Sequence, residues 1–323
     1  MYKALPYKTK HFFFVLIKLS IVFGAFYFIY NKLTSNKEID FNEFIHFLNE
    51  KRVFSLKNIF FLLLLSGMNW VLEIFKWQIL VQAIKKISFN EALKQSLGAL
   101  TASLFTPNRI GDYGAKALYF TSKYRKQILL LNFIGNTAQM LITVLLGSIG
   151  LYYFTTEHPI EINYLKTIRL LAVALLLVLL FLFGIKQNRF KIKGFSIDKI
   201  ICFIQKLSFP IKASTFLLSL LRYFVFSFQF YFLLGIFGIE ISYLDAMIAI
   251  TSMYLLASII PSIFIFDVLI KGSVAVYIFT QIGVDTFTIL SIILLMWILN
   301  FVLPSILGSF YVLTFKLPKT KNA

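Results

Sequence analysis

The segment LFTPNRIGDYGAKALYF at 104–120 combines residue types that suit the binding of an anion. Pro107 lacks a backbone N–H and forces the chain to turn, and Gly111 permits close backbone approach. Such a turn leaves unpaired N–H groups at the start of the next helix, where a phosphate binds readily. Arg109 adds a guanidinium that binds a phosphate through two hydrogen bonds. The segment therefore predicts a phosphate-binding turn, with a plain cytoplasmic turn as the alternative.

Two acid–base pairs stand at the spacing of one helical turn. Asp112 and Lys116 follow the first turn, and Asp267 and Lys271 follow Pro261 in an otherwise apolar run. Side chains at i and i+4 of a helix are neighbours and pair. An ionisable residue at membrane depth costs about 2.5–3.5 kcal/mol on insertion scales, so it predicts a functional site. For the second pair, mutual neutralisation that stabilises the local structure is the alternative.

Further polar side chains lie within apolar stretches. Glu73 lies inside the stretch 59–81, and Arg222 lies near one end of a later stretch. For Arg222, the alternative to a role in a site is a long side chain that simply reaches the membrane surface. A stripe of amides at helical spacing is expected to link helices, and its members are Asn132, Asn136 and Gln139. The candidate substrate-binding residues are Pro107, Arg109, Gly111, Asp112, Lys116, Pro261, Asp267, Lys271, Arg222 and Glu73.

Neither a metal centre nor a nucleotide-driven pump is indicated. Cys202 is the single cysteine, which excludes an intramolecular disulfide. The three histidines are scattered along the sequence, which argues against a metal site built on histidine. The sequence lacks a G-x-x-x-x-G-K-[ST] loop, a G-x-S-x-G elbow and an H-E-x-x-H pair. We therefore expect no cofactor, no metal and no catalytic activity.

The elements that position these residues must lie in a membrane. Of the 323 residues, 59% are hydrophobic and 14% are charged, and the mean hydropathy is +0.81. A soluble domain averages about 45–50% apolar and about 25% charged residues, so a soluble globular protein is excluded. A disordered chain is excluded because too few polar residues remain to keep it solvated.

Six stretches are long and apolar enough to cross a bilayer, which takes about 20 residues. They are 12–30, 59–81, 128–154, 165–185, 214–234 and 287–314. Two further apolar stretches, 92–122 and 246–281, are interrupted by Pro107 and Pro261, and we expect each to enter and leave the membrane on one side. Residues 41–48 predict a short amphipathic helix at the membrane surface.

The net charge of +18 follows this topology. With alternating spans, 21 of the 32 Lys and Arg residues fall on one side with three acidic residues, whereas nine acidic residues fall on the other side. Basic loops remain in the cytoplasm, so both termini are predicted to be cytoplasmic. The basic run at 186–199 also suits anionic lipid headgroups. We expect no nucleic-acid partner, because topology accounts for the charge.

The two interrupted stretches repeat one pattern. Glu91 precedes Pro107 by sixteen residues and Asp245 precedes Pro261 by sixteen, so the offset is 154 in both cases. The flanking spans obey the same offset, and the two hairpins enter from opposite sides, which makes the repeats inverted, as in many transporters. The predicted fold is an all-α polytopic membrane protein with six transmembrane helices plus two broken re-entrant hairpins in two inverted repeats. Its single membrane domain (1–323) has a first repeat at about 59–154, a second at about 213–314, an extra N-terminal span at 12–30 and a linking span at 165–185.

The sequence resembles the flippase-like family of the lysylphosphatidylglycerol synthase transmembrane region, over nearly the whole chain. LFTPNRIGDYGAKALYF is similar to that family's Pro-x-Arg-x-Gly-acid motif, and IIPSIFIFDVLIKG is similar to its second proline-containing motif. In the second motif, Ile263 to Phe266 replace the small residues usual in the family. The resemblance implies site roles for Pro107, Arg109, Gly111 and Asp112, and for their second-half partners Pro261, Asp267 and Lys271.

The resemblance further implies translocation of a lipid or lipid-linked headgroup across a bacterial cytoplasmic membrane, by a stand-alone member without a synthase domain. The substrate would be a phospholipid or a polyprenyl-phosphate-linked lipid. One alternative is a membrane-embedded enzyme that modifies a lipid headgroup, with Asp112 and Asp267 as acid and base. The other is a non-transporting partner that anchors a synthase. The sequence leaves open a synthase partner and a homo-oligomer.

Overall fold

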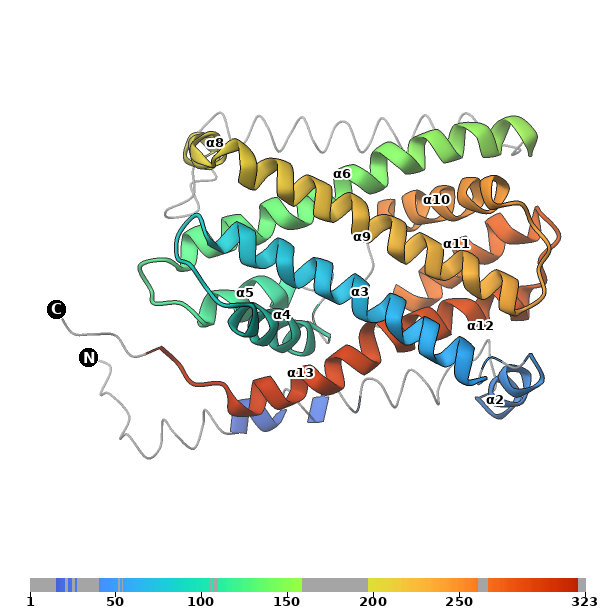
Figure 1. The fold of residues 1–323 in the computed structure, drawn as a ribbon, viewed down its shortest axis with the longest axis horizontal. Helices are drawn as coiled ribbons and strands as arrows, with labels where there is room; N and C mark the ends of the chain where they lie inside the picture. Colours follow the sequence, from blue (N-terminus) through green and yellow to red (C-terminus); the bar gives the residue numbers. More distant parts are fainter. Residues whose placement is uncertain are drawn as a thin grey trace.

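In the computed structural model, the described part of the chain is built from helices that run roughly side by side (Figure 1). The described residues are 16–20, 23–24, 27, 41–51, 53, 55–104, 106, 110–158, 197–260 and 267–318. The α-helices are α2 (Phe41–Glu50), α3 (Leu56–Val81), α4 (Phe89–Ser103), α5 (Ile110–Leu118), α6 (Arg125–Glu157), α8 (Ile197–Lys206), α9 (Phe209–Ile236), α10 (Tyr243–Ile259), α11 (Asp267–Thr280), α12 (Thr286–Trp297) and α13 (Leu303–Thr314). A π-helical turn, η2 (Ile298–Val302), joins α12 and α13 into one continuous helix.

Four helices are long and apolar enough to cross a membrane: α3, α6, α9 and the continuous helix from α12 to α13. They coincide with the spans predicted at 59–81, 128–154, 214–234 and 287–314, and these predictions are confirmed as helices of spanning length. The predicted span 165–185 lies outside the described residues, and 12–30 lies outside them for most of its length.

Both predicted interruptions separate two helices. The first stretch forms α4 and α5, and the second forms α10 and α11, with the chain leaving its helix before Pro107 and before Pro261. The residue before a proline is pushed out of the helical conformation, which accounts for the end of α10, because Ile260 directly precedes Pro261 and has an extended backbone. Helix α4 ends earlier, three residues before Thr106, the residue that Pro107 restricts. In Figure 1, α4 and α5 lie toward the left end of the bundle, and α10 and α11 lie toward the right end.

The helices that open the two broken stretches begin in the same way. Ser88 Oγ accepts a hydrogen bond from the Glu91 N–H, and the Glu91 carboxylate accepts one from the Ser88 N–H. Ser242 Oγ likewise accepts from the Asp245 N–H and donates to the Asp245 carboxylate. Each cap satisfies N–H groups that a helix start leaves unpaired. The two caps are 154 residues apart, so the repeat predicted from the prolines extends to the starts of α4 and α10.

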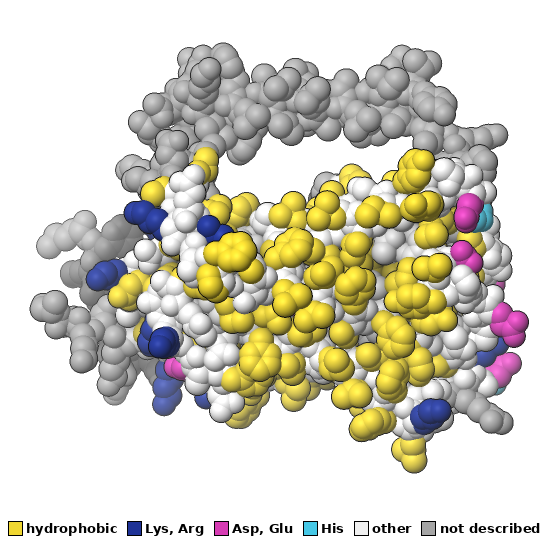
Figure 2. All heavy atoms as spheres, turned by 45° about the horizontal axis from the view of Figure 1, so that its top comes forward, with side chains coloured by type: hydrophobic (Ala, Val, Ile, Leu, Met, Phe, Trp, Pro, Cys, Tyr) yellow, Lys and Arg dark blue, Asp and Glu magenta, His cyan; other side chains and the backbone are white. Residues whose placement is uncertain are grey.

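The last long helix is the most buried of the four long helices that the structure describes. In its most apolar stretch 78% of the residues are buried, against 28–39% in the other three long helices. Those three instead expose large apolar side chains, such as Leu63 of α3, Leu145 of α6 and Leu217 of α9. On the face drawn in Figure 2, apolar side chains form a broad band across the middle, with most of the Lys and Arg at the left end and most of the Asp and Glu at the right end. An exposed apolar band of this extent marks a surface that lies in lipid.

Glycines bring α4 and α10 close to helices of the opposite half of the chain. A Cβ added at Gly308 of α13 would collide with the Leu97 carbonyl and Thr101 of α4. A Cβ added at Gly150 of α6 would collide in the same way with Thr251 of α10. Small residues at helix crossings allow close approach in membranes. Leu97 and Thr251 are 154 residues apart, whereas Gly150 and Gly308 are 158 apart, so the two contacts join corresponding helices in a reciprocal way without an exact match of residues.

The short helix predicted at 41–48 is α2. Phe44 and Leu48 are buried, and the Phe47 ring lies 5.4 Å from the ring of Phe237 and 5.0 Å from that of Phe287. Through these rings α2 covers the end of α9 and the start of α12.

Candidate functional site

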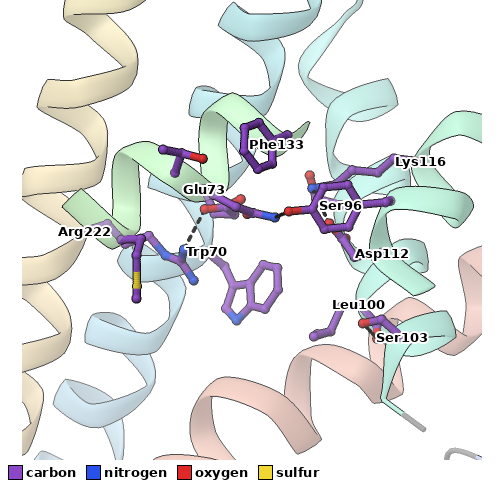
Figure 3. Close-up of a pocket in the computed structure, with 13 residues that line it drawn as sticks. Trp70, Glu73, Ser96, Leu100, Ser103, Asp112, Lys116, Phe133 and Arg222 are labelled. Atoms are coloured by element: carbon purple, nitrogen blue, oxygen red, sulfur yellow. Dashed lines mark hydrogen bonds and ion pairs between the residues drawn. The ribbon is translucent and has the colours of Figure 1, made fainter. Parts of the chain in front are cut away.

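A cavity of about 410 Å³ lies among α3, α4, α5, α6 and α9. Figure 3 shows its charged side chains converging from three of these helices, with Arg222 from α9 facing Glu73 from α3. The lining residues are Trp70, Glu73, Ser96, Leu100, Ser103, Asp112, Tyr113, Lys116, Phe133, Asn136, Thr137, Met140 and Arg222. The lining therefore combines ionic and hydroxyl-bearing side chains with aromatic and apolar ones.

Glu73 holds two cations. Its Oε2 forms an ion pair with Lys76 Nζ at 2.7 Å on its own helix, and it accepts a hydrogen bond from Arg222 Nη1 at 2.7 Å on α9. The Lys76 side chain is 2% exposed, so its charge is neutralised inside the protein by this one carboxylate. A buried ion in low dielectric needs such a partner, because desolvation costs several kcal/mol per ion. Glu73 thus neutralises Lys76 and at the same time fixes Arg222.

Arg222 retains hydrogen-bonding capacity on the cavity side. Its Nε donates to Asn69 Oδ1 at 2.9 Å and its Nη1 donates to Glu73, while its side chain is 21% exposed. Nη2 makes no hydrogen bond to any residue that the structure describes. A guanidinium has five N–H donors and no acceptor, so the unused donors at Nη2 are available to an anion.

The Lys116 ammonium group, by contrast, uses its hydrogen-bonding capacity within the protein. Its Nζ lies 3.2 Å from Asp112 Oδ2, donates to Asn132 Oδ1 at 2.9 Å and sits 4.6 Å from the centroid of the Trp77 ring. Asn132 Nδ2 also donates to Asp112 at 2.7 Å. This triangle ties α5 to α6, and the Trp77 indole in turn donates to Gln95 of α4. Lys116 therefore supplies positive charge to the cavity while its own hydrogen bonds stay within the protein.

Neutral polar groups complete the wall. Ser96 is 2% exposed, and its Oγ has no hydrogen-bond partner among the described residues. A buried hydroxyl without a hydrogen-bond partner lowers the stability of the fold, and a ligand or a water molecule in the cavity can supply the missing hydrogen bond. Tyr113 Oη accepts from Asn136 Nδ2 at 3.0 Å, which leaves its own proton free to be donated.

The cavity and its immediate support carry an excess of positive charge. Glu73 and Asp112 contribute two negative charges, whereas Lys76, Lys116 and Arg222 contribute three positive charges. In a low-dielectric interior this imbalance favours an anion over a cation or a neutral ligand.

Four of the predicted site residues meet at this cavity: Glu73, Arg222, Asp112 and Lys116. The ion pair predicted between the last two is confirmed, and Arg222 turns inward to α3 rather than to the membrane surface. The amide stripe links helices as predicted, because Asn132 and Asn136 bond to α5 and Gln139 donates to the Ser219 carbonyl of α9.

Gly111 also has the close approach predicted for it. Its N–H donates to Thr106 Oγ1 at 2.9 Å, and an added Cβ would lie 2.9 Å from Thr106 and 3.0 Å from the Ala102 carbonyl. The start of α5 is therefore packed directly on the end of α4.

The remaining predicted residues are not part of the described cavity. Pro107, Arg109 and Pro261 lie outside the described residues. Asp267 is the first residue of α11, and the position of its side chain is not described. Lys271, farther along α11, is half-buried with its Nζ 5.9 Å from the Phe301 ring centroid, and it does not line the cavity.

Sequence reasoning missed several polar residues at the site, above all Asn69 and Ser96. A signal for Asn69 was present, because Ser66, Asn69 and Glu73 recur on one face of an apolar helix. Ser96 gave no such signal, since a serine in a helix usually bonds its own backbone. Among the described residues, no group of three or more His, Cys, Asp or Glu side chains is arranged to hold a metal ion.

Apolar helices of spanning length around a charged internal cavity define a multi-pass membrane protein. The chain matches the family described as "Lysylphosphatidylglycerol synthase TM region" over residues 15–308, and it belongs to that family. No curated protein and no solved structure gave a match.

Proposed function

We propose that the protein translocates a lipid, or a lipid-linked headgroup, across a bacterial cytoplasmic membrane in the manner of a flippase. The observation that carries the proposal is Arg222: a cation inside an apolar helix bundle, held by Glu73 and Asn69, with Nη2 donors left for a ligand at the cavity. An ionisable side chain within a membrane-spanning helix is costly, and such side chains mark substrate or ion pathways, proton relays, voltage sensors or counter-ions of ligands.

A phosphate-bearing headgroup fits this cavity. Its oxygens would accept from Arg222 Nη2 and Ser96 Oγ, and the single excess positive charge would be neutralised by a phosphodiester anion. Trp70 and Phe133 offer an apolar wall to the part of the headgroup nearest the lipid tails. The tails themselves would remain against the apolar band of Figure 2. A phospholipid and a polyprenyl-phosphate-linked lipid both have this chemistry.

The predicted architecture of two inverted repeats belongs to the same proposal. It is supported by the equivalent caps of α4 and α10 and by the reciprocal glycine contacts, in which each of these helices packs on the last long helix of the other half. In this arrangement α4–α5 and α10–α11 are hairpins that enter from opposite faces, and both chain termini are cytoplasmic.

The predicted motif residues join the proposal on the grounds of sequence. Arg109 and Pro107 immediately precede α5, whose residues Asp112 and Lys116 line the cavity, so Arg109 is proposed as a second phosphate ligand. Pro261, Asp267 and Lys271 are proposed to act on the headgroup from the opposite face. Anionic headgroups are proposed to bind the basic cytoplasmic face, and a synthase partner or a homo-oligomer is compatible with the rest of the surface.

Transport by reconstituted protein tests this function. Vesicles of phosphatidylcholine containing a trace of fluorescent phosphatidylglycerol would be treated with a membrane-impermeant quencher, and the protected fraction followed in time. We expect rapid loss of protection with the protein and slow loss with Arg222→Gln. The control is Lys94→Gln, which removes one positive charge from an exposed position on α4. Equal rates for the protein and Arg222→Gln, with both folded, would contradict the proposed site.

An enzymatic role is less well supported by the same contacts. Asp112 is engaged with Lys116 and Asn132, and Glu73 with Lys76 and Arg222, so neither carboxylate is placed to exchange protons with a substrate. Mass spectrometry of the vesicle lipids after the transport assay distinguishes the two functions. A chemically altered headgroup would favour the enzyme.

A further inference from the structure

The last long helix contains a break in its regular winding that the proposed function does not use. Residues Ile298–Val302 form a π-helical turn in the most buried long helix of the described bundle. π turns are rare, usually a single turn long, and are frequent at functional sites. Because a π turn shifts the backbone hydrogen bonds of its neighbours, the carbonyls around it need other donors.

Helix α3 supplies those donors. Ser66 Oγ donates to the Leu299 carbonyl at 2.6 Å, and Trp70 Nε1 donates to the Asn300 carbonyl at 3.1 Å. Trp70 lines the cavity, and Glu73 lies one turn further along the same helix. The π turn is therefore fastened to the helix that carries the carboxylate of the site.

Within the turn, the Asn300 side chain is the middle of a chain of amides. Asn69 Nδ2 donates to Asn300 Oδ1 at 2.9 Å, and Asn300 Nδ2 donates to Gln229 Oε1 at 2.8 Å. Gln229 Nε2 then donates to the Leu62 carbonyl at 3.2 Å. At the other end, Asn69 Oδ1 accepts from Arg222 Nε at 2.9 Å.

The direction of this chain is dictated at both ends. A guanidinium can only donate, so Asn69 must present its oxygen to Arg222 and its NH₂ to Asn300. The Leu62 carbonyl can only accept, so Gln229 must present its NH₂ there and its oxygen to Asn300. Asn300 is 3% exposed and Gln229 is fully buried, which leaves water little access to replace either amide.

We propose that Asn300, held in the π turn, is a positioning residue that fixes the orientation of Arg222 through Asn69 and thereby sets the preference for an anionic headgroup. The inference rests on the proposed function. Glu73 holds only Nη1, and a planar group held at one nitrogen can still swing toward the carboxylate. Because Asn69 holds Nε as well, the direction of Nη2 is fixed before a ligand binds. Binding then requires no further loss of conformational entropy by the Arg222 side chain.

The test compares Asn300→Leu, Arg222→Gln and the double variant in phosphatidylcholine vesicles that hold a trace of fluorescent phosphatidylglycerol or of fluorescent phosphatidylcholine. We expect Asn300→Leu to slow translocation of phosphatidylglycerol on the order of tenfold, because Asn69 released from Asn300 would no longer hold Arg222 Nε, which is the loss of one hydrogen bond to a charged group. Phosphatidylcholine should be affected less. The double variant should be no slower than Arg222→Gln alone, because a positioning residue has no effect once its target is absent.

Two further variants separate positioning from folding. Asn300→Gln keeps an amide oxygen that can accept from Asn69 and an NH₂ that can donate to Gln229, and it adds no charge, so it should restore a large part of the preference that Asn300→Leu loses. Ser309→Ala removes a buried hydrogen bond that stays within α13, and it should leave the preference unchanged. Size-exclusion profiles and thermal unfolding in detergent establish that each variant is folded.

The outcomes are distinct for the two proposals. Suppose that Arg222→Gln transports phosphatidylglycerol slowly. The positioning role is then overturned if Asn300→Leu transports at the normal rate, or if Asn300→Leu slows transport by the same factor whether or not Arg222 is present. In either case the proposed function stands. If Arg222→Gln itself transports phosphatidylglycerol at the normal rate, the headgroup site fails, and the role of Asn300 fails with it.

Discussion

Glu73 Oε2 accepts a hydrogen bond of 2.7 Å from Arg222 Nη1, although the two residues are 149 positions apart in the chain. The contact joins α3 to α9, and these helices begin the two halves of the repeat that the offset of 154 predicts. Lys76 shares the same carboxylate oxygen. One carboxylate therefore couples the two halves and neutralises the most buried cation of the site.

Replacing Glu73 with glutamine should strongly destabilise the fold. The change leaves Lys76 as a buried charge without a counter-ion, and breaking a buried pair from one side costs about 3–5 kcal/mol. Thermal unfolding in detergent measures the loss. Adding Lys76→Met to Glu73→Gln should recover part of it, because the unpaired charge is then gone. Glu157→Gln, at the exposed end of α6, serves as the control and should be near neutral.

Asp112 and Lys116 should behave as one unit in a double-mutant cycle. Asp112→Asn leaves the Lys116 ammonium, 4% exposed, with only Asn132 and the Trp77 ring, and Lys116→Met leaves the carboxylate with Asn132 alone. Each single change should therefore destabilise, and the double change should cost less than the two added. A coupling free energy of about 0.5–3 kcal/mol is expected for such contacting residues. Strict additivity in unfolding measurements would show that the pair contributes nothing beyond its separate parts.

Much of this site could be predicted from local sequence, but its central contact could not. The Asp112–Lys116 pair follows from helical spacing alone, and the end of α10 follows from the backbone restriction before Pro261. The contact of Glu73 with Arg222 depends on how α3 crosses α9. The geometry of that crossing is set by side-chain packing along both helices, and a hydropathy pattern does not predict it.

The π turn was equally beyond prediction. The run 287–314 is apolar throughout, so its hydropathy fits an uninterrupted helix. The turn is stabilised by Ser66 and Trp70, which lie more than 200 residues earlier in the chain. Asn300 and Pro304 were local hints. An amide in so apolar a stretch needs partners from another helix, and a proline inside a helix removes the N–H that would otherwise bond the carbonyl four residues earlier, here that of Asn300.

The glycines at the reciprocal helix contacts should not tolerate a methyl group. Gly308→Ala would push α13 away from α4, and Gly150→Ala would push α6 away from α10, each at about 1–3 kcal/mol for overpacking. We expect lower thermal stability and slower lipid translocation for both. Gly67→Ala is the matched control: a Cβ there meets nothing within 4 Å. Because alanine is the better helix former by about 0.5–1 kcal/mol, Gly67→Ala should be neutral or stabilising. Stability unchanged at Gly308 and Gly150 would mean that these helices do not need to pack so closely.

The segregation of charge predicts which ends of the bundle face the cytoplasm. In Figure 1, α8 and the connection from α3 to α4 lie at the left end, and the connection from α9 to α10 lies at the right end. Cys202 of α8 is exposed and is the single native cysteine, so it is a ready label, and Lys85→Cys in a Cys202→Ser background labels the same end. Glu240→Cys in that background labels the opposite end.

In intact bacterial cells, a membrane-impermeant maleimide should modify the cysteine of Glu240→Cys. The cysteine of Lys85→Cys and the native Cys202 should react only after the cells are opened, because the basic end of the bundle is held in the cytoplasm. Full reaction of all three in denaturant establishes that each thiol is chemically competent. Labelling of Lys85→Cys and Glu240→Cys from the same side would be incompatible with the proposed topology. With α4–α5 as a hairpin, α6, the predicted span 165–185 and α9 give three crossings between these two positions.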